Sequence, residues 1–152
     1  MIVDQETLLN LASDELAVAQ FLTEHGGQLV RDDRLSGGGD PAIYWLTFRP
    51  RTAPDERYFS RYQWFAYPYE PASITIVNEI RGSSQLRTAW PIISGYRPDS
   101  LDICRPFCRE GYQLHAEWRE GSTACRTDGN PFLSVVQTMQ DQFDNEYQGR
   151  VT

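Results

Sequence analysis

The sequence predicts one α+β domain, in which a helix, a four-stranded antiparallel meander, an irregular segment and a C-terminal helix packed on the sheet follow one another. Two observations lead to this prediction. Apolar residues recur at helical spacing near both ends of the chain, and runs rich in aromatic and β-branched residues, separated by turn residues, lie between them. No linker or internal repeat divides the 152 residues, so we expect residues 1–152 to form a single domain.

The first helix is predicted over residues 7–24. Apolar side chains recur there mostly three or four positions apart, which is typical of a helix with one face in the core. The predicted apolar stripe comprises Leu8, Leu9, Ala12, Leu16, Ala19 and Leu22. Gly26 and Gly27 then end the helix.

Four strands follow this helix. Residues 28–31 and 42–49 are predicted to pair as a hairpin across the polar, glycine-rich turn DDRLSGGGD. This glycine run is only a weak candidate for a phosphate-binding loop, because it lacks the lysine of that motif. A third strand is predicted over residues 57–67 and, after a proline-rich interruption, a fourth over residues 73–78.

The last part of the predicted domain is an irregular segment and a helix. Residues 79–100 contain glycines and prolines and show no periodicity. The helix is predicted over residues 131–148, with Asn130 as its N-cap and Pro131 in its first turn. We expect its apolar stripe, spaced by three and four positions, to pack in the core: Phe132, Val136, Met139, Phe143 and Tyr147.

The charge of the chain excludes some partners. The net charge is -7, whereas nucleic-acid binding needs clustered positive charge. No apolar stretch reaches the roughly 20 residues of a membrane span, and MIVDQETLL lacks the positive charge of an export signal. We therefore expect a cytoplasmic protein with reduced cysteines and without nucleic-acid or membrane partners.

The basic residues are unusual in kind. All 14 of them are arginine, and the chain has no lysine. Two explanations are open. Either codon usage in a GC-rich genome favours arginine, or lysine itself is avoided.

Reactive side chains gather late in the chain. Cys104 or Cys108 would be a nucleophile if its thiolate were stabilised, and Arg105, Arg109 and His115 are the nearest candidates in sequence to do so. Either cysteine can also be a small buried apolar residue.

A metal site is the alternative for the same segment. Three thiols and an imidazole are a ligand set for structural zinc, and here they would be Cys104, Cys108, His115 and Cys125. Their spacing, C-x3-C-x6-H-x9-C, differs from that of common zinc fingers, in which two-residue spacers are usual.

A specific motif lies within FAYPYEPASITIV, before the predicted fourth strand. The pair Ile103–Cys104 stands in the segment that follows this strand, and Trp118 comes shortly afterwards. With this order of elements, the chain resembles the ubiquitin-conjugating enzymes and their inactive relatives, in a divergent, bacterial branch. The family's tyrosine-proline-aromatic-x-proline motif is matched by Tyr67, Pro68, Tyr69 and Pro71.

The resemblance implies an activity without a cofactor. Cys104 would accept a ubiquitin-like protein from an activating enzyme as a thioester and pass it to an amine. The resemblance also implies a deconjugating protease in the same pathway, and bacterial sets of this kind are often linked to phage defence. The loops around the site would be shaped by Tyr67, Pro68, Tyr69, Pro71 and Trp118.

One departure from the family bears on catalysis. Where the family has histidine-proline-asparagine before the cysteine, this chain has Trp90, Pro91 and Ile92. Another group must then donate a hydrogen bond to the oxyanion, and His115 is the candidate. The missing asparagine also favours a different class of function, a non-catalytic module that docks a ubiquitin-like protein. A small zinc-stabilised regulator is a third possibility.

Overall fold

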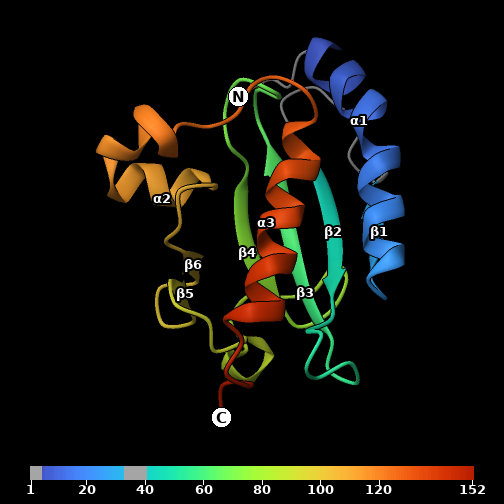
Figure 1. Cartoon of the computed structure of the whole chain (residues 1–152), viewed down its shortest axis with the longest axis vertical. Coiled ribbons are helices and arrows are strands. Elements are labelled where there is room, and N and C mark those ends of the chain that lie inside the picture. The colour runs from blue at the N-terminus through green and yellow to red at the C-terminus, as the bar shows by residue number, and fades with distance from the viewer. Residues whose placement is uncertain (1–4, 33–40) are drawn as a thin grey trace.

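The computed structural model describes residues 5–32 and 41–152. The predicted α+β class is confirmed (Figure 1). The glycine-rich run at 33–40 lies outside the described residues. The elements are α1 (Gln5–Glu24), β1 (Gln28–Arg31), β2 (Ala42–Phe48), β3 (Tyr58–Trp64), β4 (Ser73–Val77), η1 (Arg87–Ala89), β5 (Tyr96–Arg97), β6 (Asp102–Ile103), α2 (Arg109–Leu114), η2 (Ala116–Arg119), η3 (Gly121–Thr123) and α3 (Pro131–Asn145), where η marks a 3-10 helix.

The main sheet is a meander of four antiparallel strands in the order β1-β2-β3-β4. Helix α3 lies across one face of this sheet, and α1 runs beside it in contact with α3 and β1 (Figure 1). The segment after β4 forms a second, smaller unit along the β4 edge, which consists of the β5–β6 hairpin and α2. This arrangement leaves the cysteine-rich segment at one edge of the sheet.

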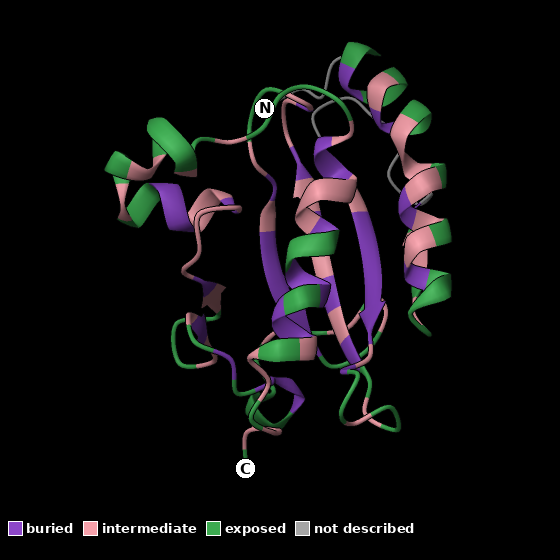
Figure 2. Cartoon of the chain, in the orientation of Figure 1, coloured by how far each residue is buried: buried purple, intermediate pink, exposed green. Residues whose placement is uncertain are grey.

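The core lies between the sheet and α3. Alternate residues of β3 are buried, as expected for a strand with one face in the core. The Tyr62 hydroxyl donates to the Met139 sulfur over 2.7 Å, and the rings of Phe48 and Phe143 stack with centroids 5.2 Å apart. The predicted stripe of α3 is confirmed, because its first four residues are fully buried and Tyr147 packs against the core. Figure 2 shows the buried stretches along the strands of the sheet behind this helix.

The predicted stripe of α1 is wrong. Leu8, Leu9 and Leu16 are 45%, 63% and 66% exposed. The helix instead buries a different face, formed by Thr7, Leu11, Val18 and Leu22, so that Leu22 alone of the predicted stripe is fully buried. Leucines are present on two faces, and contact with α3 and β1 decides which face is covered.

The residues after α3 are tied to the segment that precedes β5. Ile92 N–H donates to the Gly149 carbonyl over 2.7 Å, Gln148 N–H donates to the Ile92 carbonyl, and Val151 N–H donates to the Trp90 carbonyl. Trp90 is fully buried at this junction. No helix in the described parts of the chain has the length and apolar character needed to cross a bilayer.

Candidate active site

The tyrosine-proline motif joins three parts of the fold. The Tyr67 hydroxyl donates to the carboxylate of Asp14 in α1 and accepts from the Phe132 N–H at the start of α3. Tyr67 is fully buried, and burial raises the pKa of its hydroxyl. Its peptide bond to Pro68 is cis. Tyr67 therefore connects α1, α3 and the turn between β3 and β4.

The rest of the motif lies nearer the surface. Tyr69 is exposed and its hydroxyl donates to Glu6, at the start of α1. Pro68 and Pro71 are half-buried on either side of it. Pro71 also lines a cavity of about 320 Å³ beside the N-terminal half of α3.

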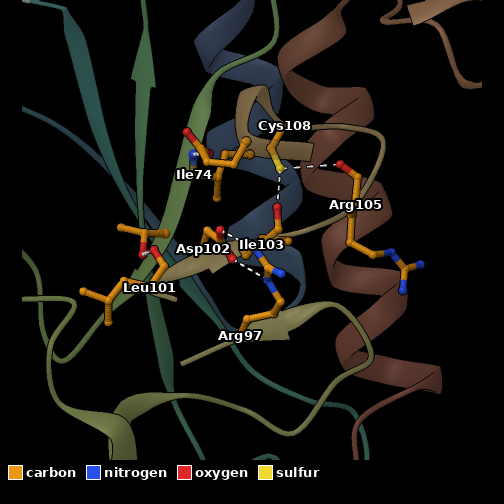
Figure 3. Close-up of polar contacts among 9 residues, drawn as sticks. Ile74, Arg97, Leu101, Asp102, Ile103, Arg105 and Cys108 are labelled. Carbon is orange, nitrogen blue, oxygen red and sulfur yellow. Dashed lines mark hydrogen bonds and ion pairs between the residues drawn. The ribbon is translucent and has the colours of Figure 1, made fainter. Parts of the chain in front are cut away.

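The β5–β6 hairpin sets the position of Cys104. Its buried side carries Tyr96 and Ile103, which face each other across the two strands and enter the core. Because side chains alternate along a strand, Arg97 and Asp102 lie on the outer side. They are also paired across the hairpin, where the Arg97 Nε donates to one oxygen of Asp102 over 2.7 Å and a terminal nitrogen donates to the other over 2.6 Å (Figure 3).

Cys104 follows β6 directly, one residue beyond Ile103. Its N–H donates to the Gly95 carbonyl over 2.7 Å, which extends the hairpin by one pair. The Cys104 side chain is partly exposed. Gly95 has a φ of +87°, and a Cβ there would stand 2.7 Å from the Arg105 Cδ and 2.9 Å from the Cys104 carbonyl oxygen. Glycine at the position opposite Cys104 therefore leaves room for the Arg105 side chain.

Cys108 lies in a different environment. It is fully buried at the N-cap of α2, and its thiol donates to the Ile103 carbonyl over 2.8 Å (Figure 3). Burial raises the pKa of this thiol to about 12. A thiol that stays protonated and covered is a poor nucleophile, so the geometry favours Cys104 over Cys108.

The pKa of Cys108 predicts a loss of stability in alkali. The unfolded thiol releases its proton near its ordinary pKa of 9.0, while the folded protein retains the proton up to about pH 12. The folded state therefore binds more protons in this range, so its stability is complete below pH 9 and falls as the pH rises. Between about pH 9 and pH 12, the free energy of unfolding should fall with pH in both proteins. The slope for the wild type should be about 1.4 kcal/mol per pH unit steeper than the slope for Cys108→Ala. Urea denaturation at several pH values measures both slopes, and equal slopes would contradict the assignment.

The two arginines expected to stabilise a thiolate have other partners. Arg105 donates to the Ser94 carbonyl over 3.0 Å and forms an ion pair with Glu146 at 3.3 Å. The Arg109 guanidinium lies over the Phe65 ring, 4.4 Å from its centroid. Neither guanidinium is therefore held toward Cys104 in the way we expected.

His115 and Trp118 form a pair of their own beyond α2. Their rings stack with centroids 4.2 Å apart, and the His115 Nδ1 lies 3.2 Å from a Glu117 carboxylate oxygen. Helix α2 separates His115 from Cys108 by roughly 10 Å, at 1.5 Å per residue. No interaction among the described residues joins His115 to Cys104. The structure does not bring the expected donor and nucleophile together.

The zinc alternative is not formed in the structure. Within residues 5–32 and 41–152, no three His, Cys, Asp or Glu side chains come together in a group that could hold a metal ion. Cys108 is bonded to a backbone carbonyl and His115 stacks on Trp118, while Cys125 lines the 320 Å³ cavity. The four predicted ligands, Cys104 included, form no such group in the described residues.

No protein family, no curated protein and no solved structure matches this chain. Its function is therefore inferred from the sequence and from the geometry of the site.

Proposed function

We propose that this chain is a carrier in a ubiquitin-like conjugation pathway, with Cys104 as the residue that holds the cargo. The observation that carries the proposal is the position of Cys104. Its partly exposed thiol stands opposite a glycine, directly after β6 in the segment that follows the four-stranded meander. The resemblance to ubiquitin-conjugating enzymes supports the proposal, since it implies an acceptor thiol in this segment, after the tyrosine-proline motif.

The chemistry needs two acyl transfers. First, the Cys104 thiolate attacks the thioester carbonyl on the activating enzyme, a carbon–sulfur bond forms, and the thiolate of the activating enzyme leaves. Next, an amine attacks the Cys104 thioester, an amide forms, and the Cys104 thiolate leaves while the amine proton passes to solvent. No cofactor takes part on the carrier.

Reconstitution tests this function. The purified chain is incubated with ATP, a ubiquitin-like protein and the activating enzyme for that protein. We expect an adduct of one cargo per chain that is lost on treatment with a thiol reductant, and mass spectrometry then identifies the modified residue. Absence of any adduct, with an activating enzyme shown to be loaded, would reject the carrier function.

A non-catalytic docking module is the second candidate. It is favoured by the observation that Arg105, Arg109 and His115 all interact with groups other than Cys104. Such a module binds the same ubiquitin-like protein without forming a covalent bond. Binding that is retained in Cys104→Ala, together with no reducible adduct in the wild type, identifies this alternative.

The absence of lysine gives a further prediction. An amine next to a thioester reacts at a high effective concentration. In Arg105→Lys the new amine directly follows Cys104, so we expect a reductant-resistant self-adduct when the loaded carrier is incubated without a target. Electrophoresis under reducing conditions detects it.

The matched control is Arg31→Lys. Arg31 is exposed on β1, the edge strand opposite β4, and this variant should show no self-adduct. If both variants load normally and neither is modified, the lack of lysine reflects codon usage.

A further inference from the structure

We propose that Arg97, held in place by Asp102, stabilises negative charge on the Cys104 sulfur. Arg97 also stabilises the oxyanion formed when cargo is transferred at Cys104, and this part of the inference rests on the proposed function. Neither Arg97 nor Asp102 was expected to have a role from the sequence, and the family's asparagine is absent from this chain.

The register of the β5–β6 hairpin places Cys104 opposite Gly95. Tyr96 pairs with Ile103 and Arg97 pairs with Asp102, so the next pair is Gly95 with Cys104. The 2.7 Å hydrogen bond from the Cys104 N–H to the Gly95 carbonyl agrees with this register.

Arg97 occupies the diagonal position next to Cys104. Alternation places Arg97, Asp102 and Cys104 on the same outer side of the hairpin, because Tyr96 and Ile103 are buried on the other side. Arg97 is then the diagonal neighbour of Cys104, at about 7–8 Å between backbone positions, which is within reach of a long side chain. Gly95, opposite Cys104, has no side chain, and the aliphatic part of the Arg105 side chain packs over it.

The guanidinium of Arg97 is held in one orientation. Asp102 accepts two hydrogen bonds from Arg97, at 2.7 Å and 2.6 Å, which fixes the planar group (Figure 3). A guanidinium has five N–H groups, so donors remain for an incoming oxyanion. The hydrogen bonds with Asp102 raise the pKa of Arg97, and negative charge on Cys104 acts in the same direction.

The other charged groups around the hairpin have their own partners. Arg105 pairs with Glu146. Glu110 of α2 accepts from the Ser73 hydroxyl and from the Ile74 N–H. Both arginines near Cys104 are thus paired, and Arg97 differs in its two short hydrogen bonds to Asp102 and in its position diagonal to the thiol.

The test measures the rate at which iodoacetamide alkylates Cys104 at neutral pH, without any cargo. A Cys125→Ser background removes the other partly exposed thiol, and Cys108 is buried. We expect Arg97→Gln to slow alkylation about threefold, the effect of one unit charge near 7 Å in a water-like dielectric. Asp102→Asn keeps an amide oxygen that can accept from Arg97 and removes the compensating negative charge, so it should accelerate alkylation by about the same factor.

Two further variants serve as controls. Arg97→Lys keeps the charge and should alkylate within about twofold of the wild-type rate. Arg31→Gln removes one partner of an arginine–glutamate pair beside β1 and should leave the rate unchanged. An unchanged rate in Arg97→Gln would overturn the proposal. The proposal would also be overturned if Arg97→Gln and Asp102→Asn changed the rate in the same direction, because a structural disturbance would affect both variants alike.

The outcome separates this inference from the carrier function. Suppose that Arg97→Gln slows alkylation and Asp102→Asn accelerates it, but reconstitution gives no adduct. The effect of Arg97 on the Cys104 thiol then stands, and the carrier function fails. If an adduct forms on Cys104 and Arg97→Gln leaves alkylation unchanged, the inference fails alone. When Arg97→Gln does not fold, the direction of change in Asp102→Asn still decides, since a slower or unchanged rate rejects the proposal.

Discussion

Replacing Cys104 with alanine should abolish the reductant-sensitive adduct completely. The thiol is the attacking group, and alanine has no atom that can form the carbon–sulfur bond. Cys104→Ser should instead collect the cargo slowly as an oxyester, which withstands a thiol reductant because the acyl group is bound to oxygen. Gel electrophoresis with and without reductant distinguishes the three proteins.

Cys108→Ala is the matched control for this experiment. The Cys108 thiol is covered and its pKa is raised to about 12, so its removal should leave the reducible adduct in place. An adduct that survives in Cys104→Ala and disappears in Cys108→Ala would show that the buried cysteine is the nucleophile. The bend between the two cysteines would then have to open during the reaction.

Gly111→Ala should destabilise the protein by about 2 kcal/mol, although alanine is the better helix former. Helix propensity alone predicts a gain of about 1 kcal/mol. However, a Cβ at this position would lie 2.0 Å from the Arg105 carbonyl oxygen. This is a backbone atom, so the clash can be relieved only if the bend from Arg105 to Cys108 shifts. Overpacking of this kind typically costs about 1–3 kcal/mol. The displaced bend should also expose Cys108 to alkylation in the folded protein. Denaturation curves and thiol labelling measure the two effects.

Gln113→Ala is the control in the same helix. Gln113 is exposed in α2, so this change should alter the free energy of unfolding by only a few tenths of a kcal/mol. If Gly111→Ala proves as stable as Gln113→Ala, the bend from Arg105 to Cys108 is more adaptable than the close contact indicates.

Much of the fold could be predicted because periodicity reports burial directly. The stripe of α3 has one apolar face, and that face is the buried one. In α1 leucines occupy two faces, and periodicity cannot rank them, because the choice depends on how the helix meets α3 and β1. Helix α2 has only six residues, which is too short for a periodic signal.

The candidate site was predictable only in part, for a related reason. A thiol can be found from residue type, so Cys104 and Cys108 were both recognised. Whether a thiol is covered depends on tertiary contacts, and these separate the two cysteines. Arg97 and Asp102 were missed because their pairing requires the chain to turn back between them, and the Pro98–Asp99 dipeptide was the available signal for such a turn.

The pairing between segment 90–92 and the residues after α3 closes a large ring in the chain. Its hydrogen bonds join Trp90 to Val151 and Ile92 to Gln148 and Gly149, so residues 90–151 begin and end at the same place. The hairpin, α2, all three cysteines and α3 lie on this ring. Because these hydrogen bonds hold the two ends of the segment together, they lower the conformational entropy that the segment can gain by local opening. Cys104 therefore lies on a loop whose two ends are joined by backbone hydrogen bonds, which disfavours local opening around the thiol.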